Sequence, residues 1–552
     1  MLQRPVRLSM VALMAGMMFA QSSKIAPDLA QDQGSDVEVI VQYRRTPTDE
    51  HHRFVRQHGG VLRTTMDFMR AAHYSVPANA IKSLAADPDV AYISPNRQVS
   101  GMLDVTAPSV NATIARQYGW TGKGIGIAII DSGISDDPDL RDPSTGNSRV
   151  VYNQSFGVTT TVDVYGHGTH VSAIAGGNGS SSKGKYTGVA PSVTFVNLKV
   201  LNDQGAGLDS NVIAAIQTAI SLKDKYNIRV INLSLGRAVY ESYTKDPLCQ
   251  AAEAAWRAGI VVVAAAGNNG RNPLTSGYAT ITAPGNDPYV ITVGAMKTMG
   301  TPTRSDDLIA SYSSKGPTLF DHIVKPDIVA PGNRLVSTLG KGGHTLSHDY
   351  PSNDVSGNYF RLSGTSMATP VVSGAVALLI QQNPGLTPDQ VKARLMKTAT
   401  KGFPSYSVAV DPITGISYTS QYDIFTIGAG YIDVWAALNN TDSTTLPAIS
   451  PTAVHNPADG TVTVTNGQSA AWGSSAAWGS SAVWGSSVWL SGASAVWGSS
   501  AVWGSGAVWG STSTSGSSAA WGSSAVWGSS AVWGSTDTTS SESTAVTIYG
   551  EN

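Results

Sequence analysis

The sequence predicts an α/β fold in which a mostly parallel sheet carries helices on both of its faces. The strands are predicted from short runs rich in valine and isoleucine and bounded by turn residues, at 125–130, 193–200, 230–235 and 260–266. Such runs are typical of strands buried on both faces. Helix-compatible stretches lie between them at 210–226 and 248–258. Because parallel strands need a crossover connection, this alternation of strand and helix indicates a parallel sheet.

The N-terminal end has the pattern of an export signal. Arg4 and Arg7 precede a short apolar run that ends at Ala20, and polar sequence follows. A basic start and a short apolar run are typical of a secretory signal peptide, and this run is too short to span a membrane. We therefore expect a signal peptide within residues 1–30, cleaved after Ala20 or Ala30, no transmembrane span, and a secreted or cell-surface protein.

Residues 31–104 are predicted to form a small α/β unit of their own. The predicted order is strand, helix, strands, helix and strand, at 37–41, 48–58, 61–74, 81–84 and 90–94. The first and last of these runs are rich in β-branched residues, and the helical stretches are polar or mixed. An unrelated N-terminal domain would fit this pattern too.

The composition limits the classes of function. At 552 residues the chain is too long for one compact core, so we expect two or three domains with accessory segments. The formal net charge of −2 gives no reason to expect nucleic acid as a partner. Cys249 is the only cysteine, so no internal disulfide can form, and a small buried apolar role suits it better than that of a catalytic thiol.

Three stretches, each containing glycine and other small residues, carry Asp131, His167 and Ser366, in this order along the chain. They are Ile129-Ile130-Asp131-Ser132-Gly133, Gly166-His167-Gly168-Thr169-His170 and Gly364-Thr365-Ser366-Met367-Ala368-Thr369-Pro370. A serine hydroxyl becomes a good nucleophile when a neutral imidazole accepts its proton, and a buried carboxylate orients that imidazole. Asp131 also stands at the end of an apolar strand, where parallel sheets place functional groups.

Each of these residues has another interpretation when it is read alone. Asp131 could bind ribose or a metal in a nucleotide fold, although no glycine-rich phosphate loop precedes it. His167 and His170 stand three residues apart, as metal ligands can, but no third ligand lies near them in the sequence. Ser366 could be a plain helix N-cap with Pro370 in the first turn.

In these motifs the chain resembles the subtilisin-like serine proteases, or subtilases, from about residue 105 to about residue 440. The resemblance implies a subtilisin-like sheet in which Ser366 is the nucleophile, His167 the general base and Asp131 the residue that orients the histidine. It also implies that Asn268, in Gly267-Asn268-Asn269-Gly270, donates its side-chain amide to the oxyanion, although Gly-Asn-Asn-Gly read alone is a turn.

The substrate walls are assigned by the same resemblance. Two segments would hold a peptide between them as an added strand, with Ser234, Leu235 and Gly236 on one side and Gly205 and Gly207 on the other. Thr282 falls where many family members have glycine at the base of the first specificity pocket. It should therefore shorten that pocket.

The resemblance implies that the chemistry requires no cofactor. Many relatives bind calcium in the loop after the histidine helix, but residues 177–183 carry no carboxylate here. A structural calcium ion is therefore not evident, and no metal ligand is assigned.

In place, size and pattern, residues 31–104 are similar to the inhibitory propeptide of secreted subtilases. The expected partners are protein or peptide substrates and the chain's own propeptide as inhibitor.

After a catalytic domain over residues 105–440 we expect a linker over 441–469 and a repeat tail over 470–552. The tail repeats a word close to Ala-Val-Trp-Gly-Ser-Ser. Its commonest interval between tryptophans is six, as from Trp472 to Trp478, so an extended tail would place them on one face. We expect an adhesive segment that contacts polysaccharide, a cell surface or its own copies and that catalysis does not need.

These observations together predict a secreted serine endopeptidase. Three alternatives remain open: a catalytically idle scaffold that adheres through its tail, a metal-dependent hydrolase, and an acid-active relative that uses glutamate as the base. The full set of Asp, His, Ser and Asn motifs argues against the first alternative. His167 lies in the family's own histidine motif, which argues against the third.

Overall fold

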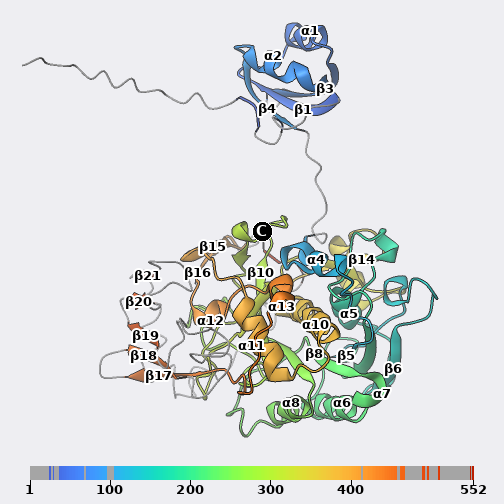
Figure 1. Ribbon diagram of the computed structural model, residues 1–552, viewed down its shortest axis with the longest axis vertical. Coiled ribbons are helices and arrows are strands. Elements are labelled where there is room, and N and C mark those ends of the chain that lie inside the picture. The colour runs from blue at the N-terminus through green and yellow to red at the C-terminus, as the bar shows by residue number, and fades with distance from the viewer. Residues whose placement is uncertain are drawn as a thin grey trace, which may run out of the picture. The chain divides into compact units, whose positions relative to one another are not determined.

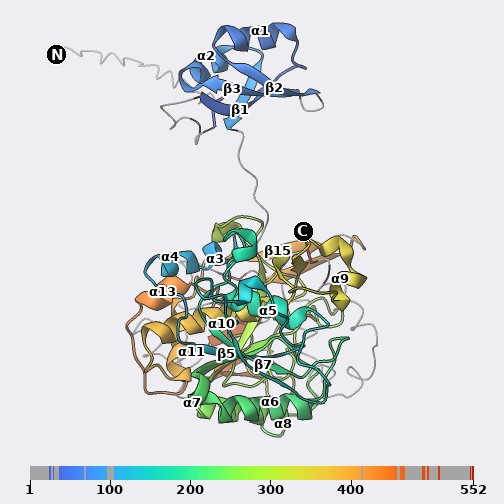
Figure 2. The ribbon, with the colours of Figure 1, turned by 90° about the vertical axis from the view of Figure 1, so that its right-hand side faces the viewer.

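The structure, a computed structural model, describes residues 24–26, 29, 36–67, 70–95, 105–411, 414–456, 461–465, 488–491, 494–496, 508–509, 548 and 550–551. The chain divides into two compact units, Met1–Ser100 and Gly101–Asn552, whose elements Figures 1 and 2 show. Residues 1–23 of the predicted signal peptide lie outside the described residues.

The N-terminal unit is a four-stranded antiparallel sheet with two helices. Its elements are β1 (Asp36–Tyr43), α1 (Asp49–Gln57), β2 (Val61–Met66), β3 (Ala71–Pro77), α2 (Ile81–Ala86) and β4 (Val90–Pro95), in the strand order β2-β3-β1-β4. Alternate residues of β1 are buried because strand side chains point to opposite faces. Both helices lie on one face of the sheet (Figure 2). The elements follow the order that the sequence pattern predicts.

The larger unit is built on an eight-stranded sheet. Its strands are β5 (Gly126–Asp131), β6 (Val150–Ser155), β7 (Thr194–Lys199), β8 (Ile228–Leu233), β9 (Val261–Ala265), β10 (Ile291–Lys297), β11 (Leu308–Ile309) and β12 (Ile328–Pro331). Their order is β11-β10-β9-β8-β5-β7-β6, and β12 also pairs with β10. Every pairing in this sheet is parallel except that of the short β11 with β10. The four apolar runs of the sequence correspond to β5, β7, β8 and β9.

Helices cover both faces of this sheet. α6 (Asp209–Ser221) and α8 (Pro247–Arg257) pack together on one face, and α5 (His167–Gly176) and α10 (Thr365–Gln382) lie on the other (Figures 1 and 2). Every residue of β5, β9 and β10 is buried, as expected when both faces are covered. The nearly fully buried α10 crosses β8, β9, β10 and β12. This architecture confirms the predicted α/β fold class.

The other elements complete the two units. The remaining described helices are α3 (Thr106–Ser109), α4 (Ala112–Gln117), α7 (Lys223–Tyr226), α9 (Thr345–Asp349), α11 (Pro388–Thr398), α12 (Ile424–Ile427) and α13 (Val434–Asn439), with short 3₁₀ turns at Ala78–Ala80, Pro138–Leu140, Ser180–Ser182, Arg304–Asp306 and Pro351–Asn353. Two hairpins pair β13 (Leu335–Thr338) with β14 (Tyr359–Leu362) and β15 (Tyr406–Val410) with β16 (Ser417–Gln421). Among the helices that the structure describes, none has the length and apolar character needed to cross a membrane.

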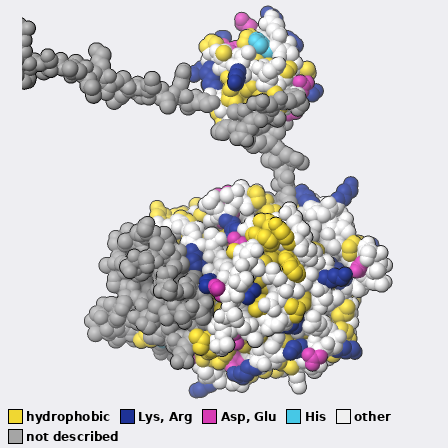
Figure 3. Space-filling model, viewed as in Figure 1, with side chains coloured by type: hydrophobic (Ala, Val, Ile, Leu, Met, Phe, Trp, Pro, Cys, Tyr) yellow, Lys and Arg dark blue, Asp and Glu magenta, His cyan; other side chains and the backbone are white. Residues whose placement is uncertain are grey.

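On the face of the larger unit that Figure 3 shows, basic and acidic side chains are interspersed among neutral ones. This mixture agrees with the small formal net charge of −2. Nucleic-acid binding uses clustered basic side chains, and this face offers no support for it.

Part of the predicted linker, residues 441–469, packs into the core of the larger unit. Ala448 is fully buried, and the Ser450 hydroxyl donates a hydrogen bond to the buried carboxylate of Asp327. The buried Lys392 Nζ donates to Ser450 Oγ over 2.9 Å. Because buried charged groups need hydrogen-bonding partners, these contacts make Ser450 part of the packed core of the larger unit. Local composition could not reveal this use of Ser450.

The repeat tail is described in short strands and in residues near its end, 548 and 550–551. The strands are β19 (Val488–Ser491), β20 (Ser494–Val496) and β21 (Val508–Trp509). They continue a sheet whose first strands, β17 (Thr452–Asn456) and β18 (Thr461–Thr465), lie in the predicted linker. Trp472 and Trp478, on whose spacing the tail prediction depends, lie outside the described residues. The single tryptophan-bearing face therefore stays a prediction.

Candidate active site

Asp131 and His167 meet at the carboxyl end of β5. Asp131 is the last residue of that strand, and His167 is the first residue of α5. His167 Nδ1 donates a hydrogen bond to Asp131 Oδ1 over 2.8 Å. Asp131 is fully buried, and only 7% of His167 is exposed. In this geometry a carboxylate fixes the orientation and tautomer of an imidazole.

Glycines allow α5 to approach the end of β5 this closely. A Cβ at Gly168, in the first turn of α5, would lie 2.3 Å from Gly133 O and 3.1 Å from Asp131 Cβ. Gly133 has a φ of +116°, and a Cβ there would lie 2.7 Å from Thr161 O. Only glycine combines this backbone conformation with such close contacts. Gly133 and Gly168 therefore allow the carboxylate and the imidazole to come together.

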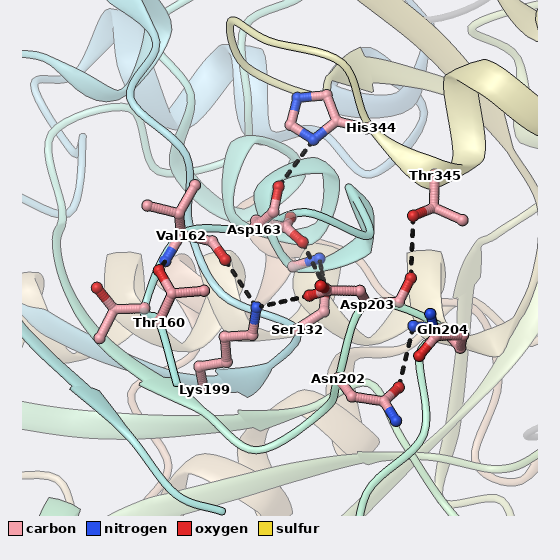
Figure 4. A network of polar contacts seen from close by, with 12 residues as sticks. Ser132, Thr160, Val162, Asp163, Lys199, Asn202, Asp203, Gln204, His344 and Thr345 are labelled. Carbon is pink, nitrogen blue, oxygen red and sulfur yellow. Dashed lines mark hydrogen bonds and ion pairs between the residues drawn. The ribbon is translucent and has the colours of Figure 1, made fainter. Parts of the chain in front are cut away.

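A second buried carboxylate, Asp163, joins the loop after β5 to the start of α5 (Figure 4). Its Oδ1 accepts hydrogen bonds from Ser132 Oγ (2.8 Å) and Gly166 N (2.7 Å). Its Oδ2 accepts from Thr169 N (2.8 Å) and Thr169 Oγ1 (2.7 Å). Burial raises the pKa of Asp163, although these four hydrogen bonds favour the carboxylate. Sequence reasoning missed this residue, whose only signal is an acid just before the histidine motif.

Two further contacts in Figure 4 hold the loop that contains Asp163. His344 Nδ1 donates to Asp163 O over 2.8 Å, and Lys199 Nζ donates to Val162 O over 2.7 Å. The Lys199 side chain is fully buried and also lies 3.4 Å from Asp203 Oδ1. These donors come from distant parts of the chain, so tertiary packing fixes the backbone from which α5 begins.

The two histidines of α5 have different environments. Burial lowers the pKa of His167, but the negative charge of Asp131 and its hydrogen bond outweigh this effect, so the pKa lies above its ordinary value. Burial lowers the pKa of His170 to about 3, and its Nε2 donates to Phe360 O over 2.9 Å. His170 therefore stays neutral near pH 7, whereas His167 is suited to accept and release a proton.

Ser366 lies in the first turn of α10, which packs against α5, the helix that carries His167. The N-cap residue Gly364 has a φ of +144°. Ser366 is partly exposed, whereas its two neighbours are buried. Its carbonyl oxygen accepts a hydrogen bond from Ser234 Oγ over 2.8 Å, so this contact does not occupy the Ser366 hydroxyl. Backbone N–H groups at a helix start favour negative charge, which suits a site for a developing oxyanion.

Asn268 follows β9 and is held by Thr365, the neighbour of Ser366. Its Oδ1 accepts from Thr365 N (2.9 Å) and Thr365 Oγ1 (3.1 Å), and Gly267 N donates to Thr365 Oγ1 (3.1 Å). With its oxygen held in this way, Asn268 has its donor group Nδ2 close to the start of α10. Nδ2 lies 3.1 Å from the position that a Cβ on Gly364 would occupy. A fixed amide donor beside the start of α10 can stabilise a negative oxygen there. Thr365 is a second residue whose positioning role sequence reasoning missed.

Thr282 lies between the predicted wall at Ser234, Leu235 and Gly236 and the segment that carries Asn268. It is buried, and a Cβ on Gly236 would lie 2.6 Å from its Oγ1, while one on Gly267 would lie 2.8 Å from its Cγ2. Leu235 is partly buried against the main core. A side chain so placed can form the base of a pocket between the two segments.

The other predicted wall, Gly205 and Gly207, lies in the loop after β7. Gly205 has a φ of +77°, and a Cβ there would lie 2.6 Å from the ring of Tyr165. Just beyond the two walls, Arg237 and Asp209 form an ion pair with a closest distance of 2.8 Å. This ion pair joins the segments that the sequence assigns to opposite sides of a bound peptide.

Among the described residues, no group of three or more His, Cys, Asp or Glu side chains is arranged to hold a metal ion. Hydrogen bonds hold the loop after α5: Ser181 N donates to Asp139 Oδ1 over 2.7 Å, and Asn178 Nδ2 donates to Arg141 O over 2.6 Å.

Cys249 is buried, and burial raises the pKa of its thiol above the usual range. A thiol in such surroundings is a poor nucleophile.

The parallel α/β sheet carries a carboxylate–imidazole pair at one strand end and a serine at the start of its central helix. This arrangement points to a serine hydrolase. The sequence model of the Subtilase family matches residues 122–415, more than half of the chain. The chain therefore belongs to the Subtilase family and is a subtilisin-like serine protease. Subtilases need no cofactor for catalysis.

Two curated relatives agree with this family. Serine protease AprX of Bacillus subtilis (strain 168) is 37% identical over 347 residues, which cover 61% of this chain and 76% of the relative. Subtilisin E of the same strain is 32% identical over 387 residues, which cover 68% of this chain and 89% of the relative. Among solved structures, Sphericase has 29% sequence identity and a TM-score of 0.43, covering 57% of this chain and 92% of its own.

Proposed function

We propose that this chain is a secreted serine endopeptidase in which Asp131, His167 and Ser366 form the catalytic triad. The observation that carries the proposal is the 2.8 Å hydrogen bond from His167 Nδ1 to the fully buried Asp131. This bond leaves Nε2 as the ring nitrogen that can accept a proton. The packing of α5 against α10 adds support, since these helices carry His167 and Ser366.

In the proposed reaction, His167 Nε2 takes the proton of Ser366 Oγ as that oxygen bonds to the carbonyl carbon of the substrate. The tetrahedral intermediate collapses when Nε2 gives this proton to the leaving amine and the carbon–nitrogen bond breaks. Water then attacks the acyl-enzyme in the same way, which releases the acid and restores Ser366. Asp131 stabilises the imidazolium in both halves of the reaction.

The oxyanion is proposed to lie between Asn268 Nδ2 and the backbone N–H of Ser366. Asn268 cannot rotate without breaking the two hydrogen bonds from Thr365 to its Oδ1. Its donor group is therefore oriented before the substrate binds, and preorganised donors of this kind stabilise the transition state more than the ground state.

A serine-directed phosphonate probe tests this function. The probe should label the mature protein at Ser366, as located by peptide mass mapping, and a chelator should not prevent the labelling. Ser366→Ala should abolish it. An activity that a chelator removes and the probe leaves intact would support a metal-dependent hydrolase instead. A folded, mature protein that the probe never labels would support the adhesive alternative.

Residues 31–104 are proposed to act as an inhibitory propeptide, and residues 470–552 as an adhesive tail. The N-terminal unit supports the first proposal because it has a core of its own, which includes Val39, Val41 and Tyr74. The basic start and the short apolar run of the sequence support export. The substrates are then extracellular proteins or peptides.

The kcat/KM of the mature enzyme is expected to fall as the pH decreases, with a midpoint above about 6.5, the ordinary histidine pKa. His167 must be neutral to act as the base, and its raised pKa means that it becomes protonated at a higher pH than an isolated histidine. Hydrolysis of a small peptide across pH 4–10, with folding checked at each pH, measures this. Constant activity down to about pH 4 would point to a carboxylate base.

Small and medium apolar side chains are expected to be preferred over Phe and Tyr immediately before the cleaved bond, because Thr282 shortens the proposed pocket. Thr282→Gly should raise kcat/KM for Phe and Tyr substrates by about tenfold or more, while Thr282→Ser, which keeps the hydroxyl, should change it less. A peptide-library profile measures both. If Phe and Tyr already dominate the profile of the parent enzyme, Thr282 does not form the base of the pocket.

A further inference from the structure

The end of the chain is bound to the catalytic unit by contacts that the proposed reaction does not use. Ile548 and Glu551 are each 2% exposed. The carboxylate of Glu551 lies among basic and hydroxyl groups, and its backbone pairs with a side-chain amide. We infer that these last residues are a built-in peptide ligand, held in a site that selects a Gly-Glu sequence. The site anchors the far end of the repeat tail to the catalytic unit.

The site recognises the Glu551 carboxylate through buried positive charges. Arg271 Nη2 lies 3.0 Å from Oε1, and Lys297 Nζ lies 3.1 Å from Oε2. Ser311 N donates to Oε1 over 2.8 Å, and the Ser311 hydroxyl donates to the same oxygen. The side chains of Arg271 and Lys297 are each only 4% exposed. Asp411 also pairs with Arg271, so the carboxylate of Glu551 is shared between Arg271 and Lys297. Because buried cations need anionic partners, the site favours an acidic residue of this length.

The site also recognises the backbone around Glu551. Asn333 Oδ1 accepts from Glu551 N over 2.8 Å, and Asn333 Nδ2 donates to Glu551 O over 2.8 Å. Asn353 Nδ2 donates to Ile548 O. A side-chain amide that pairs with both polar groups of one residue imitates a neighbouring strand, as in many peptide-binding sites.

Glycine is required at the position before Glu551. Gly550 has a φ of +64°, and a Cβ there would lie 2.3 Å from Ser363 Oγ and 2.8 Å from Arg334 Cγ. A side chain would thus be strained by the backbone conformation and would also clash with the site. Together with the carboxylate contacts, this makes Gly-Glu the sequence that fits.

The linker that precedes the tail is fixed to the same unit. Val324 N donates to Pro451 O over 2.8 Å, and Ala453 N donates to His322 O over 2.8 Å. The segment between these contacts and Ile548 is therefore held at both ends. Residues 460–536 carry no charged side chain, so the acidic end is the part of the tail that suits a cationic site.

Cutting the tail of the full chain tests the inference. A recognition sequence for an unrelated, sequence-specific protease is inserted within residues 511–518, in a Ser366→Ala background that prevents self-digestion. After cutting, the C-terminal fragment should co-elute with the rest of the protein in native size-exclusion chromatography. Glu551→Gln and Gly550→Val should each release the fragment, because they change the ligand and not the catalytic unit. Glu542→Gln removes the same charge elsewhere in the tail and should leave the fragment bound.

A second measurement uses a synthetic peptide with the sequence of residues 544–552. It should bind to the full chain that carries Gly550→Val, whose own end no longer fits the site. Replacing the glutamate of the peptide by glutamine should weaken binding by about tenfold or more, since it removes a buried charge from its partners. The inference is overturned if the parent fragment separates on cutting, if Glu551→Gln and Gly550→Val retain it, or if the two peptides bind equally.

Discussion

Ser366→Ala is expected to lower kcat by about a millionfold, the size of effect known for removing the nucleophile of subtilisin. Without the hydroxyl no acyl-enzyme can form, and only binding and the oxyanion donors remain to assist attack by water. The fold should be kept, because Ser234 donates its hydrogen bond to the Ser366 carbonyl, which alanine retains. Hydrolysis of a small peptide substrate measures the loss, and thermal unfolding checks the fold.

The same variant should remain joined to its propeptide, provided that maturation is autocatalytic. The cut is expected between Ser94 and Val105, where the proposed propeptide meets the catalytic domain. Intact mass and N-terminal sequencing of secreted protein show whether the cut has occurred. A Ser366→Ala protein that matures at the normal rate in a protease-deficient host would show that another protease removes the propeptide.

Asn268→Ala is expected to lower kcat by about a hundred- to a thousandfold with little change in KM, the range known for removing the corresponding donor of subtilisin. In the proposed mechanism the amide donates to an oxygen that becomes negative only in the transition state, so substrate binding should be nearly unaffected. Steady-state kinetics on one peptide substrate separate kcat from KM.

The neighbouring Asn269→Ala provides the matched control for this prediction. Asn269 is held through its backbone N–H, which donates to Ser314 Oγ over 3.0 Å, so alanine keeps that contact. Its kcat should stay close to that of the parent enzyme. If Asn268→Ala changes KM alone, or if both variants lose the same activity, Asn268 is only part of a turn.

The sequence by itself determined the features that depend on local pattern. Strands buried on both faces must be apolar along their whole length, so β5 and β9 were visible as β-branched runs. The contacts that bring Asp131 and His167 together exclude side chains at Gly133 and Gly168, so the positions of these two residues were marked by glycines. The order of Asp, His and Ser along the chain then indicated the class of chemistry.

Only the tertiary structure decided how ordinary polar residues are used. Several polar residues whose roles the sequence left unassigned are buried, and each has a hydrogen-bond partner from a distant segment. They are Asp163, Thr365, Ser450 and Glu551. A buried polar group must find a partner, and folding alone determines which segments supply it. The strand pattern and the glycine motifs are local properties of the chain, whereas the supports of the site and the anchor of its tail arise from long-range packing.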